Sequence, residues 1–342
     1  MLAPCENAAY LPETKLPRKT VKRIITRGIA LALAAACGAV LAQAFPDKPV
    51  RVVIPYAPGG GTDNLVRVIA PSVGANLGQP LIIENRPGGA SIIGSEIVAK
   101  ATPDGYTLLA TDSAVFMNPG LFKAKMPFDT QKSLTGVTMM AFAPVLLVVH
   151  PSVPANSLKE LLALARSKPG SLNYASGGYG AATHLAGELV KQAAHVFIVH
   201  IPYKGTGPAM TDLLAGQVHM QFAGISSARS HVEAGKLRAI ALTGKQRNPA
   251  MPGVPTFDEG GLPGIDADTY WGLYAPAGVP AAVLATLNRA FVAALRGPTH
   301  AERLAALGFL PLANSPQEHT QQMRSMIARW TDVIDKGKIT AE

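Results

Sequence analysis

Short aliphatic runs alternate along the chain with segments whose apolar residues recur every three or four positions. The first run, residues 50–54, is followed by a glycine loop and then by residues 65–77, where every fourth residue is apolar. This pattern predicts a strand followed by a helix, which Pro71 should kink or break. Further strands are predicted at residues 81–83, 107–110, 172–175, 196–201, 220–222, 239–243 and 309–312. Strands and helices at this spacing predict βαβ units on parallel sheets.

Two segments interrupt this alternation and predict where the chain changes domain. An apolar run at residues 141–149 leads into PSVPANS, whose two prolines stiffen the chain, so a first crossing is expected at residues 143–154. Residues 261–278 predict the return crossing. The expected fold is α/β with two lobes, a cleft between them and two crossings at the hinge. The predicted division is 45–145 for the first part of lobe 1, 146–264 for lobe 2 and 265–342 for the return to lobe 1.

Four loops are predicted to face that cleft, because each lies between the end of a strand and the start of a helix. They are Tyr56–Asp63, Pro87–Ser91, Ser176–His184 and Tyr203–Gly207. Glycines and helix N-termini leave backbone N–H groups free to bind an anion, and a small carboxylate suits such neutral donors best. The candidate ligand contacts are Tyr56, Ala57, Gly59, Gly60, Gly61, Thr62, Asp63, Gly89, Ser91, Ser113, Ser176, Gly177, Gly180, Ala181, Thr183, His184, Tyr203, Lys204, Gly205, Thr206 and Ala223. Any one of these loops could equally be an ordinary turn.

The first 44 residues have the features of a cleaved secretory signal peptide. A basic cluster at residues 15–27 precedes an almost wholly apolar stretch at 28–41 and a small-residue site at 42–44. The apolar stretch is shorter than the roughly 20 residues of a membrane-spanning helix. Lipidation at Cys37 remains an alternative. Periplasmic export is therefore expected, although the exact start and cleavage positions stay open.

Removing this segment changes the charge and the cysteine content. Of the 31 Lys and Arg residues and the 22 Asp and Glu residues, six and two respectively lie in residues 1–44, so the net charge falls from +9 to +5. Both cysteines also lie there, which leaves no disulfide or thiol chemistry for the remainder. Without a basic stripe interleaved with aromatics, no nucleic-acid partner is expected.

Catalytic motifs are largely missing from the sequence. It contains no G-x-G-x-x-G, Walker A, G-x-S-x-G or H-E-x-x-H pattern. His184 and Glu188 are spaced for one helix face, but a plain helix pair is favoured over a metal site. Asp266 and Asp268 lie near the return crossing, where hinge roles are favoured over acid–base chemistry. The expectation is a protein without catalytic residues, metal or cofactor.

Seven motifs, in order, resemble the Bug family, the extracytoplasmic solute-binding proteins of tripartite tricarboxylate transporters. They are FPDKPVRVVIPYAPGGGTD, ENRPGGASIIGSE, TPDGYTLL, NYASGGYG, IPYKGTGPAMTDLLAGQV, GKLRAIALTG and PGVPTFDEGGLPG. The resemblance covers residues 45–342. It implies a type II periplasmic-binding fold that closes like a Venus flytrap on a carboxylated solute, binding it through amides, hydroxyls and bridging water. It also implies membrane transporter subunits as partners, and a monomer is expected.

Three residues depart from the family pattern and bear on ligand choice. Ala181 replaces a common Ser or Thr, and His219 and Ala223 stand where aspartates are usual. Losing a carboxylate at Ala223 should weaken recognition of an ammonium group, so a di- or tricarboxylate or an aromatic acid is favoured over an amino acid. Two alternatives remain: an exported hydrolase or isomerase using His184 as its base, and a solute sensor without a transport role.

Overall fold

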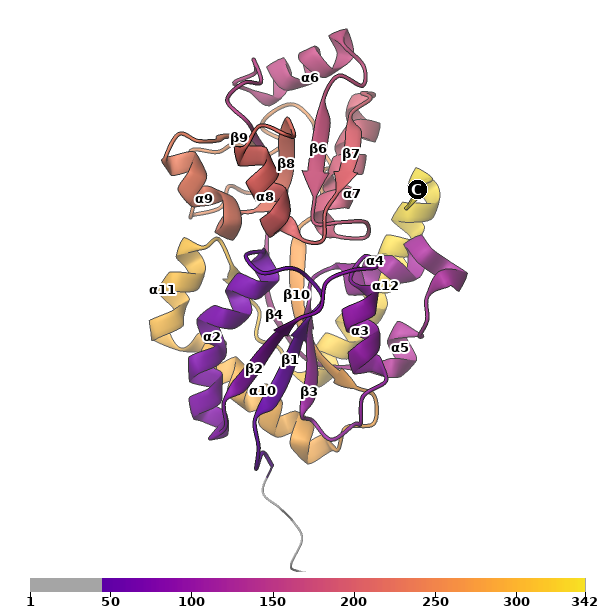
Figure 1. The fold of residues 1–342 in the computed structure, drawn as a ribbon, viewed down its shortest axis with the longest axis vertical. Coiled ribbons are helices and arrows are strands. Elements are labelled where there is room, and N and C mark those ends of the chain that lie inside the picture. Colours follow the sequence, from indigo (N-terminus) through magenta and orange to yellow (C-terminus); the bar gives the residue numbers. More distant parts are fainter. Residues whose placement is uncertain (1–44, 342) are drawn as a thin grey trace, which may run out of the picture. The chain divides into compact units, whose positions relative to one another are not determined.

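The computed structural model describes residues 45–341. The predicted signal peptide and Cys37 lie outside the described residues. Within them, the strands form two separate sheets (Figure 1). The first sheet has the order β11-β4-β10-β3-β1-β2. Its strands are β1 Val50–Ile54, β2 Leu81–Asn85, β3 Thr107–Thr111, β4 Leu134–Ala143, β10 Thr269–Pro276 and β11 Leu310–Pro311.

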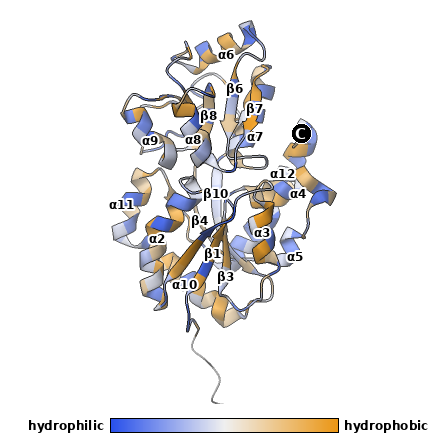
Figure 2. Cartoon of the chain, viewed as in Figure 1, coloured by the Kyte–Doolittle hydropathy of each residue, from blue (hydrophilic) through white to orange (hydrophobic). Residues whose placement is uncertain are grey.

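Helices cover both faces of the first sheet, and together they form the first lobe (Figure 1). On one face lie α2 Gly61–Leu77, α10 Ala281–Arg296 and α11 Pro298–Ala306; on the other lie α3 Ile92–Ala99, α4 Ala114–Phe122, the 3-10 turn η1 Lys123–Lys125, α5 Thr130–Ser133 and α12 Pro316–Gly337. Strand β1 is buried on both sides, because Val52 belongs to the apolar cluster with α2 and Val53 to the cluster with α12. The strands accordingly show mainly apolar residues in Figure 2, whereas the helices show both kinds.

The second sheet and its helices form the second lobe. Its order is β7-β6-β8-β5-β9. Its strands are β5 Val145–Val149, β6 Asn173–Ser176, β7 Val199–Pro202, β8 Met220–Gly224 and β9 Arg238–Leu242. Helices α6 Leu158–Ser167 and α7 Ala182–Ala194 pack on one face, and α8 Thr206–Leu214 and α9 Ile225–Glu233 on the other. The side chains of β5 alternate between the two faces of the sheet. Leu147 belongs to the apolar cluster with α6 and α7, and Leu146 belongs to the cluster with α8 and α9.

The chain passes between the lobes twice, and a polar contact ties the two passages together. Strand β4 ends at Ala143 in the first sheet, and β5 begins at Val145 in the second, with only Pro144 between them. The chain returns through β10. The Thr243 hydroxyl accepts a hydrogen bond from the Val145 N–H at 2.8 Å and donates one to Asp268 Oδ1 at 2.7 Å. This hydroxyl therefore links both passages at the hinge.

The two-lobed α/β fold expected from the sequence is confirmed, but the strand directions are not. Both sheets are mixed rather than parallel: β10 runs antiparallel to β3 and β4, and β5 runs antiparallel to β8 and β9. Part of the predicted return segment is strand β10. Pro71 lies inside α2 without interrupting it. Ser91 sits at the N-cap of α3 with φ +70° and its side chain caps nothing, whereas Ser157 and Ser315 do cap α6 and α12.

No helix in residues 45–341 combines the length and the apolar character that a membrane crossing requires.

Candidate ligand-binding cleft

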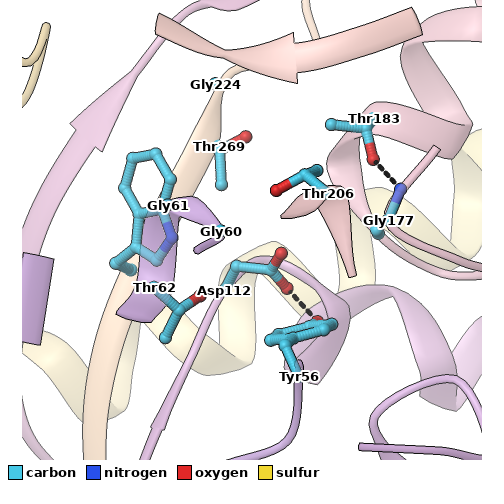
Figure 3. Close-up of a pocket in the computed structure, with 12 residues that line it drawn as sticks. Tyr56, Gly60, Gly61, Thr62, Asp112, Gly177, Thr183, Thr206, Gly224 and Thr269 are labelled. Carbon is cyan, nitrogen blue, oxygen red and sulfur yellow. Dashed lines mark hydrogen bonds between the residues drawn. The ribbon is translucent and has the colours of Figure 1, made fainter. Parts of the chain in front are cut away.

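A small cavity lies where the two lobes meet, and residues from both sheets line it (Figure 3). Its volume is about 30 Å³. Eight of the predicted ligand contacts line it: Tyr56, Gly60, Gly61, Thr62, Gly177, Ala181, Thr183 and Thr206. Four further residues complete the lining: Asp112, Gly224, Thr269 and Trp271.

Four helices begin at this cavity. Gly60 is the N-cap of α2, Ala181 of α7 and Gly224 of α9, while Thr206 is the first residue of α8. The first amides of a helix have no partner within the helix. In the described part of the chain, no hydrogen bond is made by the N–H groups of Gly60, Gly61, Thr62, Ala182 or Thr206. These unpaired donors, together with the positive ends of four helix dipoles, create an environment that favours an anion.

In the first lobe, a buried carboxylate fixes the glycine loop. Asp63 accepts hydrogen bonds from the Gly59 N–H at 3.1 Å, Arg67 Nε at 2.9 Å and Asn85 Nδ2 at 3.1 Å. Burial raises the pKa of Asp63, but these three donors outweigh burial and hold the pKa below its ordinary value. Asp63 is therefore ionised, and its negative charge is compensated by these three donors at the glycine loop.

In the second lobe, neutral groups fix the corresponding loop. Thr183 Oγ1 accepts from the Gly177 N–H at 3.0 Å, and His184 Nδ1 accepts from the Gly180 N–H at 3.4 Å. Ser176 Oγ accepts from the Gly178 N–H at 3.1 Å. The predicted contacts Ser176, Gly180 and His184 thus shape the loop from behind the cavity lining.

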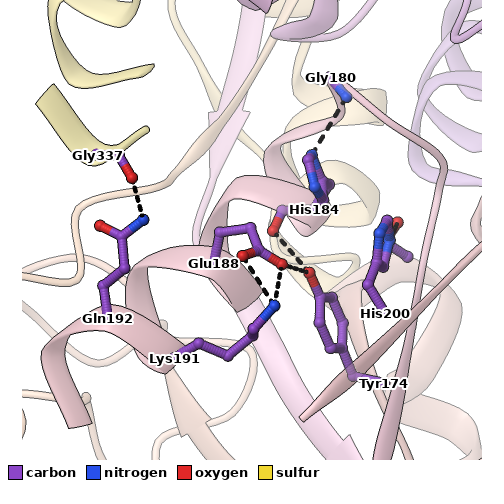
Figure 4. Close-up of polar contacts among 9 residues, drawn as sticks. Tyr174, Gly180, His184, Glu188, Lys191, Gln192, His200 and Gly337 are labelled. Carbon is purple, nitrogen blue, oxygen red and sulfur yellow. Dashed lines mark hydrogen bonds and ion pairs between the residues drawn. The ribbon is translucent and has the colours of Figure 1, made fainter. Parts of the chain in front are cut away.

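A buried pair of histidines supports this second loop (Figure 4). The rings of His184 and His200 stack with centroids 4.5 Å apart, and His200 Nε2 lies 2.7 Å from Ser176 Oγ. Burial lowers the pKa of His184 to about 4 and that of His200 to about 3, so both rings are neutral at pH 7. Tyr174 stacks on His200 and donates to Glu188 at 2.8 Å, and Glu188 in turn pairs with Lys191. His184 and Glu188 therefore act within a packing network.

Backbone contacts between the lobes close the rim of the cavity. The Ala57 N–H of the first lobe donates to the Lys204 carbonyl of the second at 2.9 Å. A Cβ added to Gly207 would lie 2.4 Å from the Pro58 carbonyl oxygen, and one added to Gly180 would lie 1.9 Å from Asn118 Oδ1. Only glycine permits these approaches, so the spacing of the lobes depends on residues without side chains.

One carboxylate lines the otherwise neutral cavity. Asp112 Oδ1 accepts from the Tyr56 hydroxyl at 2.5 Å and from the Ala114 N–H at 2.9 Å (Figure 3). Burial raises the pKa of Asp112 to about 6, although the Tyr56 hydroxyl, the Ala114 N–H and the N–H of Asp112 itself act in the opposite direction. Burial and the charge of Asp112 together raise the pKa of Tyr56, which keeps its proton. Asp112 is thus mainly ionised near pH 7.5.

Trp271 and Thr269 reach the cavity from β10, in a segment for which only a return crossing was predicted. A Cβ on Gly61 would lie 2.8 Å from the Trp271 ring, so the indole occupies the space that a side chain would need at the start of α2. Asp112 had a visible signal, because it follows β3 directly, as the other loops follow their strands. Its neighbour Ser113, which was selected instead, is buried and accepts from the Tyr270 N–H.

Several other predicted contacts lie outside the cavity lining. Gly89 packs against Ile93, and the Ser91 hydroxyl accepts from Asn118. The Tyr203 hydroxyl bonds to Asp212, and the Lys204 side chain is exposed. A Cβ added to Gly205 would lie 3.3 Å from the Ala57 amide nitrogen.

Ala223 lies in the apolar core of the second lobe, and its neighbour Gly224 lines the cavity. An aspartate at position 223 would therefore be buried among apolar side chains.

The groups considered for catalysis lie elsewhere. His184 is 1% exposed and does not line the cavity. Asp266 pairs with Arg329 on α12, and Asp268 accepts from Thr243 at the hinge. No cluster of three or more metal-ligating side chains occurs in residues 45–341.

Comparisons with known proteins show a consistent set of relatives. Residues 65–339 match the family model for the tripartite tricarboxylate transporter family receptor. A UPF0065 protein of Pseudomonas sp. is 34% identical over 322 residues, which is 94% of this chain and 96% of the relative. Protein BugT of Bordetella pertussis is 34% identical over 308 residues, covering 90% and 94% of the two chains.

Solved structures give the same result. The periplasmic binding protein BugD superposes with a TM-score of 0.84 at 32% identity, covering 86% of this chain and 99% of BugD. An R. palustris protein with adipate has a TM-score of 0.83 at 33% identity, covering 86% and 99%. MatC from Rhodopseudomonas palustris with bound malate has a TM-score of 0.81 at 34% identity, covering 85% and 100%.

Proposed function

The chain belongs to the tripartite tricarboxylate transporter family receptors, and from that premise we propose that it is a periplasmic solute-binding protein for a small carboxylated solute. The solute binds in the cavity between the lobes and is released unchanged. Di- and tricarboxylates and aromatic acids are the favoured classes. Adipate, which accompanies one similar structure, and malate, which is bound in another, are both dicarboxylates.

The observation that carries this proposal is the convergence of four helix N-termini on one cavity. Its lining contains no Lys or Arg side chain among the described residues, so the positive potential comes from the backbone. A carboxylate can accept from several amides at once, and a hydrogen bond to a charged group contributes about 1.5–3 kcal/mol. The unpaired amides of Gly60, Gly61, Thr62, Ala182 and Thr206 are the proposed donors.

The size of the cavity supports a binding cycle in which the lobes open and close. Its volume of about 30 Å³ is far below the roughly 300–1,000 Å³ of pockets that hold drug-sized ligands. A dicarboxylate therefore enters only when the lobes separate at the hinge. Closure is favoured to the extent that the ligand binds the closed form more tightly than the open form.

The cellular setting is the further part of the proposal. Residues 1–44 direct export and are removed, and the mature protein acts as a monomer. It delivers its solute to the membrane subunits of a tripartite tricarboxylate-type transporter. The proposed division is 45–145 and 265–342 for the first lobe and 146–264 for the second.

Calorimetric titration of residues 45–342 tests the proposal. The protein is unfolded and refolded to remove any carried-over ligand, and it is then titrated with di-, tri- and aromatic carboxylates, amino acids and the corresponding carboxamides. One-to-one binding of carboxylates, with the solute recovered unchanged and the carboxamides bound far more weakly, is the expected result. A folded protein that binds none of the acids would contradict the proposal.

A further inference from the structure

We propose that Asp112 makes the cleft selective for carboxylates that carry a hydroxyl group next to the carboxylate, with this hydroxyl donating to Asp112 Oδ2. The inference rests on the proposed function and narrows its ligand class to hydroxy acids. It starts from a difference in hydrogen bonding between the two oxygens of the Asp112 carboxylate. Oδ1 accepts hydrogen bonds from Tyr56 and Ala114, whereas no other residue of the described chain donates to Oδ2, and the one further donor to this carboxylate is the N–H of Asp112 itself.

The position of Asp112 makes this second oxygen part of the cavity. Asp112 is one of the lining residues, and Figure 3 shows the oxygen that Tyr56 does not bind directed toward the other lining groups. The Tyr56 hydroxyl and the Ala114 amide hold the carboxylate from the first-lobe side. Because the carboxylate is fixed by two donors, its free oxygen has a defined direction.

An acceptor at this place conflicts with a ligand that carries only carboxylate groups. An ionised carboxylate accepts hydrogen bonds and donates none, so Oδ2 would face the ligand with no donor between them. Leaving a desolvated charged acceptor unpaired is costly, and like charges repel. A hydroxyl on the ligand removes both problems, because it donates to Oδ2 while the ligand carboxylate takes the helix amides.

The same lining favours a hydroxyl over an ammonium group. An ammonium brings three N–H donors and no acceptor, whereas Asp112 is the single charged acceptor among the lining residues. Four helix N-termini add positive potential, which disfavours a cation. A hydroxyl needs one acceptor and can itself accept from a neighbouring amide.

The test compares matched acids that differ only at the carbon next to the carboxylate. The probes are malate, succinate and aspartate; 2-hydroxyglutarate, glutarate and glutamate; and mandelate and phenylacetate, each titrated into refolded residues 45–342 at pH 7.5. In at least one set the hydroxy acid should bind about tenfold or more tighter than its deoxy partner and tighter than its amino partner. These ratios need no variant, so they can overturn the inference by themselves.

Asp112→Asn then assigns the preference to this residue. An asparagine can keep the contacts with Tyr56 and Ala114 through its carbonyl oxygen while presenting an NH₂ donor to the cavity. The hydroxy acid's advantage should fall to within about twofold, and deoxy acids should bind more tightly than to the wild type. Asp332→Asn, which changes an exposed aspartate on α12, is the matched control and should leave every ratio unchanged.

The possible outcomes distinguish a failure of the hydroxyl assignment from a failure of the proposed carboxylate-binding function. Deoxy acids that bind as tightly as hydroxy acids in every set would overturn the hydroxyl assignment and leave the carboxylate function standing. Amino acids that bind most tightly would overturn it in favour of an ammonium. A folded Asp112→Asn variant that keeps the full preference would overturn the role of Asp112. Failure of every acid to bind would overturn the proposed function as well.

Discussion

The glycine loop of the first lobe is held by a buried ionised carboxylate, whereas the corresponding loop of the second lobe is held by a threonine hydroxyl and neutral imidazoles. Both loops follow a strand, precede a helix and line the same cavity. The ionised Asp63 carboxylate accepts hydrogen bonds from Gly59, Arg67 and Asn85. Thr183 and His184 accept from Gly177 and Gly180 without any charge.

This difference shows how carboxylates can lie beside a cavity that is proposed to bind an anion without repelling that anion. The charge of Asp63 is compensated by donors within its own lobe. The second loop brings no negative charge to the cavity, and Glu188 behind it is paired with Lys191. Asp112 is the exception, since one of its oxygens remains available to the cavity. The two loops should therefore respond differently to acid and to the loss of their acceptors.

Acid should produce the largest effect, and the second lobe holds two of the three described histidines whose pKa values burial lowers most, His184 and His200, the third being His319 on α12 of the first lobe. The pKa values of His184 and His200 lie near 4 and 3 in the folded protein, against about 6.5 in an unfolded chain. Below pH 6.5 the unfolded chain therefore binds protons that the folded chain cannot, and stability falls as the pH falls. The expected loss between pH 7 and pH 4.5 is about 2 kcal/mol for each histidine. Urea unfolding at both pH values measures it.

A histidine variant makes the acid test specific. His184→Gln should reduce this pH dependence by about 2 kcal/mol, whatever its stability at pH 7. His195→Asn, which replaces an exposed histidine at the end of α7 with φ +52°, is the matched control. The first loop should keep its protection over this range, because the pKa of Asp63 lies below its ordinary value. Hydrogen exchange that increases first at residues 59–63 would contradict the comparison.

Removing the charged acceptor of the first loop should be the next largest effect. Asp63→Ala leaves Gly59, Arg67 and Asn85 without their shared partner, and we expect a loss of about 1.5–3 kcal/mol in the free energy of unfolding. Chemical denaturation at pH 7 measures this loss. Asp332→Asn serves as the control on an exposed helix face, and an equal loss in both variants would argue against this role of Asp63.

Gly207→Ala should weaken ligand binding by blocking closure. The added Cβ would meet the Pro58 carbonyl oxygen across the rim, where neither backbone can yield easily. Overpacking of this kind costs about 1–3 kcal/mol, which corresponds to roughly 5- to 150-fold weaker binding. Calorimetry gives the affinity, and small-angle scattering gives the ligand-induced change in radius of gyration. Gly253→Ala, at a glycine with open space around it, is the matched control.

The smallest expected effect is the loss of the neutral acceptor in the second loop. Thr183→Val keeps the shape of the side chain and removes the oxygen that accepts from Gly177. A neutral hydrogen bond contributes about 0.5–1.5 kcal/mol, so the unfolding free energy should fall by about 1 kcal/mol. Chemical denaturation compares this variant directly with Asp63→Ala. A larger loss for Thr183→Val would reverse the comparison between the two loops.

Much of the fold follows from local patterns that the sequence displays. The aliphatic runs became β1, β2, β3 and β8, and a local capping box at Ser315 begins α12. Strand direction could not be derived in the same way, because it depends on which strands become neighbours. Strand β10 lies between β3 and β4 and runs antiparallel to both, which places Trp271 in the cavity.

The cavity residues show the same limit at finer scale. Glycine loops were identifiable from composition, and Gly60, Gly61 and Gly177 line the cavity, whereas Gly89 packs against Ile93 outside it. Which of two neighbours faces the cavity depends on the strand's register. Ala223 lies in the apolar core, whereas its neighbour Gly224 lines the cavity. In the same way Ser113 is bonded to the Tyr270 N–H, whereas its neighbour Asp112 lines the cavity. A shift of one residue exchanges core and cavity, and composition does not contain that information.

The most direct test of the account is to observe the helix amides themselves. Residues 45–342 labelled with ¹⁵N would be titrated with the tightest-binding carboxylate and, separately, with its methyl ester. The predicted result is a set of downfield amide-proton shifts concentrated at Gly60, Gly61, Thr62, Ala182 and Thr206. These shifts should be much smaller with the ester. If the acid binds while these amides stay unchanged, or if the ester shifts them equally, the carboxylate is not held by the N-termini of α2, α7 and α8.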